Sequence, residues 1–95
     1  MTIQIQSIHF SADQKLVSFI NKKLFKIISI DDNIVNTDVY LKIEKSSNHN
    51  NKTTEIKIHS SLCHYFAKKT SDSFEESVDL ATQAIRKQVL KQKSK

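Results

Sequence analysis

Basic side chains recur at helical spacing in the first third of the chain. Lys15, Lys22 and Lys26 are separated by seven and then four residues. At about 100° per residue they fall on one narrow stripe of a helix, and Lys23 lies toward one side of it. After Asp13, this segment has no acidic residue that would pair with these lysines at helical spacing. A row of unpaired ammonium groups suits a polyphosphate such as a nucleic-acid backbone, and an ordinary solvated helix face is the alternative.

A second group of basic residues lies near the C-terminus, behind a run of acidic ones. The basic residues are Arg86, Lys87, Lys91, Lys93 and Lys95, and the acidic ones are Asp72, Glu75, Glu76 and Asp79. This order complements a helix macrodipole, which favours acids at the start of a helix and cations at its end. The dipole acts within the last turn, however, and Arg86 and Lys87 lie about two turns further in. Phosphate binding therefore stands beside the dipole as an explanation for these two residues.

The whole chain is basic, with 15 Lys and Arg against 10 Asp and Glu, a net charge of +5 and a pI near 9.4. This charge favours a polyanionic partner, although its sign does not say where the charge lies. Arg86 is the only arginine. Because lysine acts as a point charge on phosphates, the composition favours recognition of shape and backbone over base sequence. A Lys-for-Arg drift of the source genome would give the same bias.

Catalytic and metal-binding motifs are absent from the sequence. There is no glycine, hence no Gly-rich phosphate loop, and no helical His-Glu-x-x-His pattern occurs. His59, Cys63 and His64 have spacings of four and one, which match no compact zinc motif. Strand alternation is also expected to send His59 and its neighbours to different faces. Since so small a domain rarely holds an active-site cavity, we expect no enzyme activity, no metal and no cofactor.

The location of the protein is expected to be cytoplasmic. Cys63 is the single cysteine, so no internal disulfide can form, which fits a reducing compartment. The residues from Met1 to Phe10 lack the charged start and apolar core of a secretory signal. No apolar run approaches the ~18–20 residues that span a bilayer, so no membrane partner is expected.

Two helices are expected to carry the basic residues. The first should run from about Ala12 to Ile28, with a capping box at Ser11-x-x-Gln14. The second should start at Asp72 or Ser73, with a capping box at Ser73-x-x-Glu76. Each has one apolar stripe, formed in the first helix by Leu16, Val17, Ile20, Leu24, Ile27 and Ile28, and in the second by Phe74, Val78, Ala81, Ile85 and Val89.

Alternating apolar and polar residues predict four strands, at about residues 2–8, 37–45, 53–59 and 62–68. In the second strand Val39, Leu41 and Ile43 should point inward. Tyr40 should point outward, where it either stacks on a base or packs as an ordinary sheet residue. A hairpin loop is expected from Ser46 to Asn51, and either face of the last strand can be the inward one.

The order β-α-β-β-β-α predicts an α+β fold. Because each helix has a single apolar stripe to bury, the natural arrangement is one antiparallel-rich, four-stranded sheet with both helices on one face. The sequence shows no repeat and no linker, so residues 1–95 are expected to form a single domain.

The order of the elements and several segments resemble the ribosome hibernation-promoting factor family, also called ribosome-associated inhibitors. The matching segments are Ile3–Asp13, Val39–Lys45, Phe66–Lys68, Ser73–Glu76 and Ala84–Val89. No one motif is diagnostic, and the specificity lies in their order and spacing over nearly the whole chain.

This resemblance implies a fold related to double-stranded-RNA-binding domains. It also implies docking on the small ribosomal subunit, in the groove where mRNA and tRNA would sit, so that translation is blocked by occupancy. The family grips rRNA with basic residues on both helices. The residues at the matching positions are Lys22, Lys23 and Lys26 in the first helix and Arg86, Lys87, Lys91 and Lys93 in the second.

The chain departs from the family pattern in three places. Leu90 stands where the family commonly has a basic residue, and the loop before Phe66 lacks the usual Pro-Gly. The chain ends at Lys95, as in short forms without the domain that drives ribosome dimerisation. Promotion of ribosome dimers is therefore an open question, and the resemblance implies a monomer off the ribosome with no small-molecule substrate.

Two other functions remain in competition at this point. A generic double-stranded-RNA-binding module would bind an isolated duplex as tightly as the small subunit. A basic protein-interaction adaptor would bind an acidic protein, and nuclease treatment of its partner would leave that binding intact.

Overall fold

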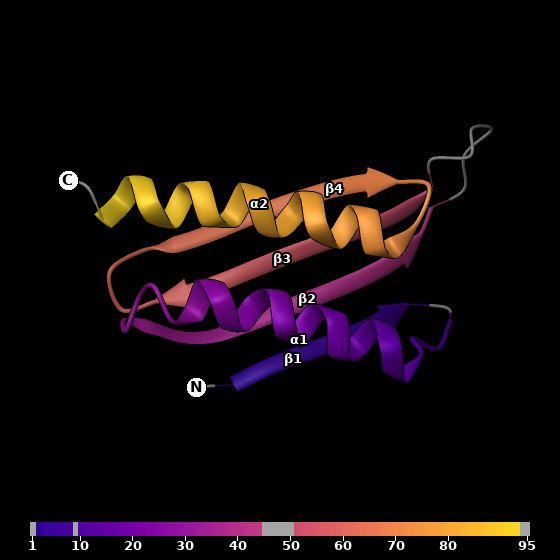
Figure 1. Cartoon of the computed structure of the whole chain (residues 1–95), viewed down its shortest axis with the longest axis horizontal. Coiled ribbons are helices and arrows are strands. Elements are labelled where there is room, and N and C mark those ends of the chain that lie inside the picture. Colours follow the sequence, from indigo (N-terminus) through magenta and orange to yellow (C-terminus); the bar gives the residue numbers. More distant parts are fainter. Residues whose placement is uncertain (1, 9, 45–50, 94–95) are drawn as a thin grey trace.

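The periodic segments of the sequence form six elements in the computed structural model, which describes residues 2–8, 10–44 and 51–93 (Figure 1). The strands are β1 (Thr2–Ile8), β2 (Ile34–Ile43), β3 (Lys52–Ser60) and β4 (His64–Ser71), and the helices are α1 (Gln14–Ile28) and α2 (Phe74–Lys93). The order β-α-β-β-β-α confirms the predicted fold class.

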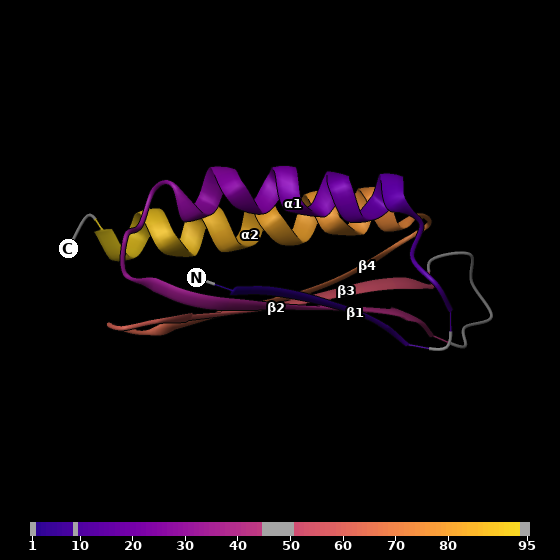
Figure 2. The same cartoon turned by 90° about the horizontal axis from the view of Figure 1, so that it is seen from below.

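The sheet has the strand order β1-β2-β3-β4. Strands β1 and β2 are parallel because α1 crosses over between them, whereas β2, β3 and β4 form an antiparallel meander. Both helices cover the same face of the sheet and leave the other face open (Figure 2). This is the layered arrangement that the two apolar stripes predict.

The core lies between the two helices and the sheet. In α1 the buried residues are Leu16, Ile20, Leu24 and Ile27, and in α2 the buried apolar residues are Val78, Ala81, Ile85 and Val89. The sheet contributes Val39, Leu41, Ile56, Ile58, Tyr65 and Ala67. The last strand therefore turns Tyr65 and Ala67 inward, which settles the face that the sequence left open.

Three expectations about the strands need correction. Strand β2 begins at Ile34 rather than at residue 37, and β4 covers His64–Ser71 rather than 62–68. Ile43 is 47% exposed instead of buried, because it is the last residue of β2 and pairs with Lys52 at the end of the sheet. The hairpin loop expected from Ser46 to Asn51 lies, except for Asn51, outside the described residues.

The capping box expected at Ser11 is wrong. Asp13 is the N-cap of α1, with extended backbone and a side-chain oxygen that accepts a 2.7 Å hydrogen bond from the amide of Leu16. A carboxylate also interacts favourably with the positive end of the helix dipole, which a serine hydroxyl does not. At the second helix the serine half of the expected capping box is confirmed, since Ser73 Oγ accepts a hydrogen bond from the Glu76 amide at 3.2 Å.

The edge strand β4 is tied to α2 by one glutamine. Gln88 Nε2 donates to the carbonyl of Phe66 at 2.8 Å, and Gln88 Oε1 accepts from the amide of Phe66 at 3.3 Å. One side-chain amide thus satisfies both backbone groups of a residue on the outer edge of the sheet.

Hydroxyl groups inside the core differ in whether they have partners. Thr54 Oγ1 and Ser77 Oγ are 2.7 Å apart and join β3 to α2 in a fully buried pair. The Oγ1 of Thr37, also fully buried, has no hydrogen-bond partner among the described residues. Its register neighbours in the sheet are Ile3 and Ile58. An unpaired buried hydroxyl carries an uncompensated desolvation cost.

Replacing Thr37 by valine should therefore stabilise the fold by about 1 kcal/mol, because the shape is kept and the unpaired hydroxyl is removed. Urea unfolding should show a higher midpoint with an unchanged slope. The matched control is Thr54→Val, which breaks the pair with Ser77 and should destabilise by about 1 kcal/mol. Equal destabilisation by both variants would contradict this account of Thr37.

Candidate nucleic-acid interface

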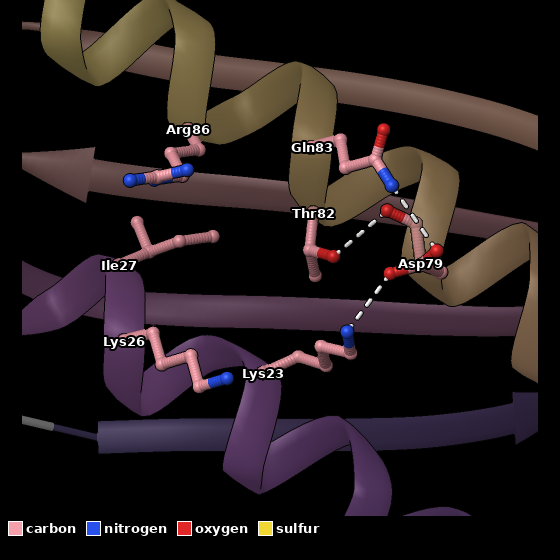
Figure 3. A pocket seen from close by; sticks show the side chains of 7 residues that line it. All are labelled: Lys23, Lys26, Ile27, Asp79, Thr82, Gln83 and Arg86. Atoms are coloured by element: carbon pink, nitrogen blue, oxygen red, sulfur yellow. Dashed lines mark hydrogen bonds and ion pairs between the residues drawn. The ribbon is translucent and has the colours of Figure 1, made fainter.

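Helices α1 and α2 lie side by side on the sheet (Figure 1). A groove of about 210 Å³ opens between them, and Figure 3 shows the side chains that line it. Its lining residues are Lys23, Lys26 and Ile27 from α1 and Asp79, Thr82, Gln83 and Arg86 from α2. Three of the residues that the sequence singles out for rRNA binding thus meet in one place. The core stripes explain this, because burying both against the same sheet leaves the flanking polar positions facing one another.

One pair of charges spans the groove. Lys23 Nζ donates to Asp79 Oδ1 at 2.9 Å, and Gln83 Nε2 donates to Asp79 Oδ2 at 3.1 Å (Figure 3). Lys23 also lies 5.5 Å from the ring centroid of Phe19. Both charged side chains are about a third exposed, so the ion pair contributes at most ~1 kcal/mol to stability. Lys23 therefore differs from the other lysines of α1 in having an acidic partner, which comes from the opposite helix.

Lys26 and Arg86 face the same groove from opposite helices, with Ile27 between them (Figure 3). Both are exposed. Within the described part of the chain, neither side chain forms an ion pair. Two cations without acidic partners over a partly apolar floor form an arrangement that can accept a phosphate group, and the guanidinium can do so through two parallel hydrogen bonds.

The basic surface continues from the groove across α2. A second hollow of about 340 Å³ is lined by Gln83, Arg86, Lys87 and Leu90, so it shares Gln83 and Arg86 with the first. Leu90 is 43% exposed there. On α1, Lys15 and Lys22 are exposed and likewise have no acidic partner among the residues described.

The two basic residues at the end of α2 lie in a different setting. Lys93 Nζ donates to the carbonyl oxygen of Ile30 and lines a hollow with Asp31 and Asp32. Lys91 is exposed on the last turns of the helix. Lys93 is thus engaged with the end of α1, whereas Arg86 and Lys87 lie beside the groove.

The open face of the sheet carries lysines as well, but there they are matched by acids or by an aromatic ring. Lys42 and Lys68 both approach the carboxylate of Glu55, at 3.2 and 3.7 Å, and Lys68 is also 3.6 Å from Glu44. The amine of Lys57 lies 5.6 Å from the ring centroid of Tyr40, so this ring already has a cation over it. On this face Lys42 and Lys68 thus have acidic partners and Lys57 has an aromatic one, whereas among the described residues Lys26 and Arg86 of the groove have neither.

Other site types find little support in the described residues. Within 2–8, 10–44 and 51–93, no group of three or more His, Cys, Asp or Glu side chains is placed to hold a metal ion. In the same residues, neither helix has a stretch long and apolar enough to cross a membrane.

Comparisons with known proteins agree with this fold. A ribosomal subunit interface protein from Coxiella burnetii has a similar structure, with a TM-score of 0.87, 25% sequence identity and full coverage of both chains. The N-terminal domain of Protein Y from Thermus thermophilus matches with a TM-score of 0.80 and 16% identity, over 94% of this chain and 96% of that domain, which speaks for the fold alone. Comparison with curated protein sequences gave no match.

The family resemblance seen in the sequence is confirmed, because a model of one protein family matches residues 3–95, which is nearly the whole chain. Except for Thr2, the first residue of β1, the elements and the helical basic surface described above lie within this region. The chain belongs to the sigma 54 modulation protein / S30EA ribosomal protein family.

Proposed function

We propose that this protein binds the small ribosomal subunit through its two helices and represses translation by occupying the groove that mRNA and tRNA would use. The observation that carries the proposal is the separation of charge between the two faces. Cations without acidic partners, Lys22, Lys26, Arg86 and Lys87, lie on the helical side, whereas the lysines of the open sheet face are matched by acids or an aromatic ring.

Family membership and the similar subunit interface protein support a ribosomal partner over an acidic protein or a free duplex. The chemistry of the surface supports contacts to phosphates. Structured RNA offers phosphates and 2′-hydroxyls in a fixed geometry, and flexible lysines can neutralise them without reading bases. Arg86 is the one residue that can add a planar, two-point contact.

Seven residues are proposed as rRNA contacts: Lys22, Lys23, Lys26, Arg86, Lys87, Lys91 and Lys93. The chain would act as a single domain without catalysis or a cofactor, and it would be a monomer off the ribosome. Lys23 and Lys93 hold intramolecular partners in the free protein, so their contacts to rRNA require those partners to be exchanged. Lys22, Lys26, Arg86 and Lys87 require no such exchange and should contribute most.

Neutralising the triplet Lys26, Arg86 and Lys87 to glutamine should abolish co-sedimentation with the small subunit at moderate salt. For the unmodified protein, neutralisation of ~4–6 phosphates predicts that log affinity falls with log salt at a slope of roughly −3 to −5. In the triplet variant the slope should weaken by roughly 2–3 units. Translation assayed in parallel should be relieved.

The matched control removes the same charge from the open face, by changing Lys42, Lys57 and Lys68 to glutamine. Its ribosome affinity and salt slope should stay close to those of the unmodified protein. An equal loss of ribosome affinity in both variants would show that binding depends on net charge alone. The helical surface would then be the wrong assignment. Equally tight binding of the unmodified protein to an isolated RNA duplex would favour the generic RNA-binding function, and nuclease-resistant binding would favour a protein partner.

Replacing Asp79 by asparagine should tighten ribosome binding several-fold. The change removes the only carboxylate that lines the groove in the described structure and frees the Lys23 amine for a phosphate. The magnitude of the salt slope should rise by about one unit. The double variant Lys23→Gln with Asp79→Asn loses a neutral pair, so its affinity should return to that of the unmodified protein. Weaker binding of Asp79→Asn would mean that the bridge matters chiefly for holding the two helices in place.

A further inference from the structure

Two histidines of the β3–β4 hairpin face each other across the strands. His59 and His64 are directly paired in the sheet register. The turn between them is tight, since the Ser60 amide donates to the Cys63 carbonyl at 2.9 Å and the Leu62 amide to Ser60 Oγ at 3.2 Å. The expectation that alternation separates His59 from its histidine neighbour is therefore wrong, because the turn returns the chain in register on the same face.

The geometry brings one nitrogen of each ring into contact. The two Nδ1 atoms are 3.0 Å apart, and the rings meet edge to face with centroids 4.9 Å apart. On its other side, His59 Nε2 lies 3.6 Å from Asp38 Oδ2 of strand β2. A carboxylate at Nε2 favours the tautomer that carries its proton there, which leaves the lone pair of Nδ1 directed at His64.

These distances fit the coordination of a metal ion by two imidazoles. At 3.0 Å the two nitrogens are within hydrogen-bond distance of each other, so both can be ligands of one ion at roughly 2.1 Å from it. Copper and nickel are the divalent ions that nitrogen donors bind most strongly in this series. We propose that His59 and His64 form a two-imidazole site for a divalent copper- or nickel-type ion, with Asp38 positioning His59.

The surroundings of the pair are compatible with a cation. Asp38 is 21% exposed in its side chain and supplies negative charge beside His59. Lys57 lies on the same face, two residues before His59. Its amine lies over the ring of Tyr40, which pairs with Glu55 and is therefore further from His59 along the strands. Phe66, the next residue of β4 on this face, is half exposed and carries no charge. Water would fill the remaining coordination positions, so the affinity is expected to be moderate.

Cys63 does not take part in this site. It lies next to His64 in the chain, but its thiol is hydrogen bonded with the hydroxyl of Tyr65, which belongs to the inward face of β4. Burial, together with this hydrogen bond, raises the pKa of Tyr65 well above its ordinary value. The proposed site therefore has two nitrogen ligands and one positioning carboxylate, on the face opposite to the helices.

Titration of the whole protein with CuCl₂ and NiCl₂, followed by calorimetry and by electron spin resonance of the copper form, tests the proposal. One ion per chain and a copper spectrum with two coordinated nitrogens are expected. His59→Gln and His64→Gln should each weaken binding at least about tenfold, and Asp38→Asn by about tenfold. Affinity should fall as the pH is lowered, because protons compete for the imidazoles.

His49→Gln provides the matched control, since it removes an imidazole from elsewhere in the chain and should leave binding unchanged. Circular dichroism should show that all variants are folded. Absence of uptake by the unmodified protein would overturn the proposal and leave the pair as a hydrogen bond only. Unchanged affinity in both His59→Gln and His64→Gln would overturn it as well.

Discussion

Both helices pack on the same face of one sheet, and most of this structure follows from their side-by-side placement there. Each helix has a single apolar stripe, and a sheet of four strands is wide enough for two helices placed side by side. Once Ile20 and Leu24 of α1 and Ala81 and Ile85 of α2 are buried, the positions beside those stripes must line a common groove. The groove is thus a result of core packing, and the polar residues that line it are the part free to serve function.

The electrostatic consequence is a molecule with two unlike faces. On the open side of the sheet, cross-strand neighbours such as Lys42 and Glu55 neutralise each other at short range. Within α2 the acids are confined to the first half of the helix, and beyond Asp79 its exposed charges are positive. A phosphate-rich partner therefore meets an oriented field and not a uniform net charge, which favours one docking direction.

Periodicity predicted the elements, their order and the core, because buried stripes and alternation depend on local spacing alone. It failed where the structure depends on which residues are neighbours in space. The cap at Asp13 was missed because Ser11 offered an equally good local pattern, and the exposure of Ile43 depends on where the sheet ends. The Lys23–Asp79 bridge joins residues 56 positions apart, and the meeting of His59 with His64 depends on the turn between them. Of the basic residues, the sequence could name the candidates, but only the packing of α1 on α2 shows which of them share a groove.

The glutamine that ties α2 to β4 bears on how such a protein behaves when many copies are present. Strand β4 forms an edge of the sheet, and the free backbone groups of an edge strand can pair with strands of other molecules. By holding both backbone groups of Phe66, Gln88 occupies the site where an incoming strand would begin to add. The contact therefore blocks one point at which β4 could pair with a second molecule.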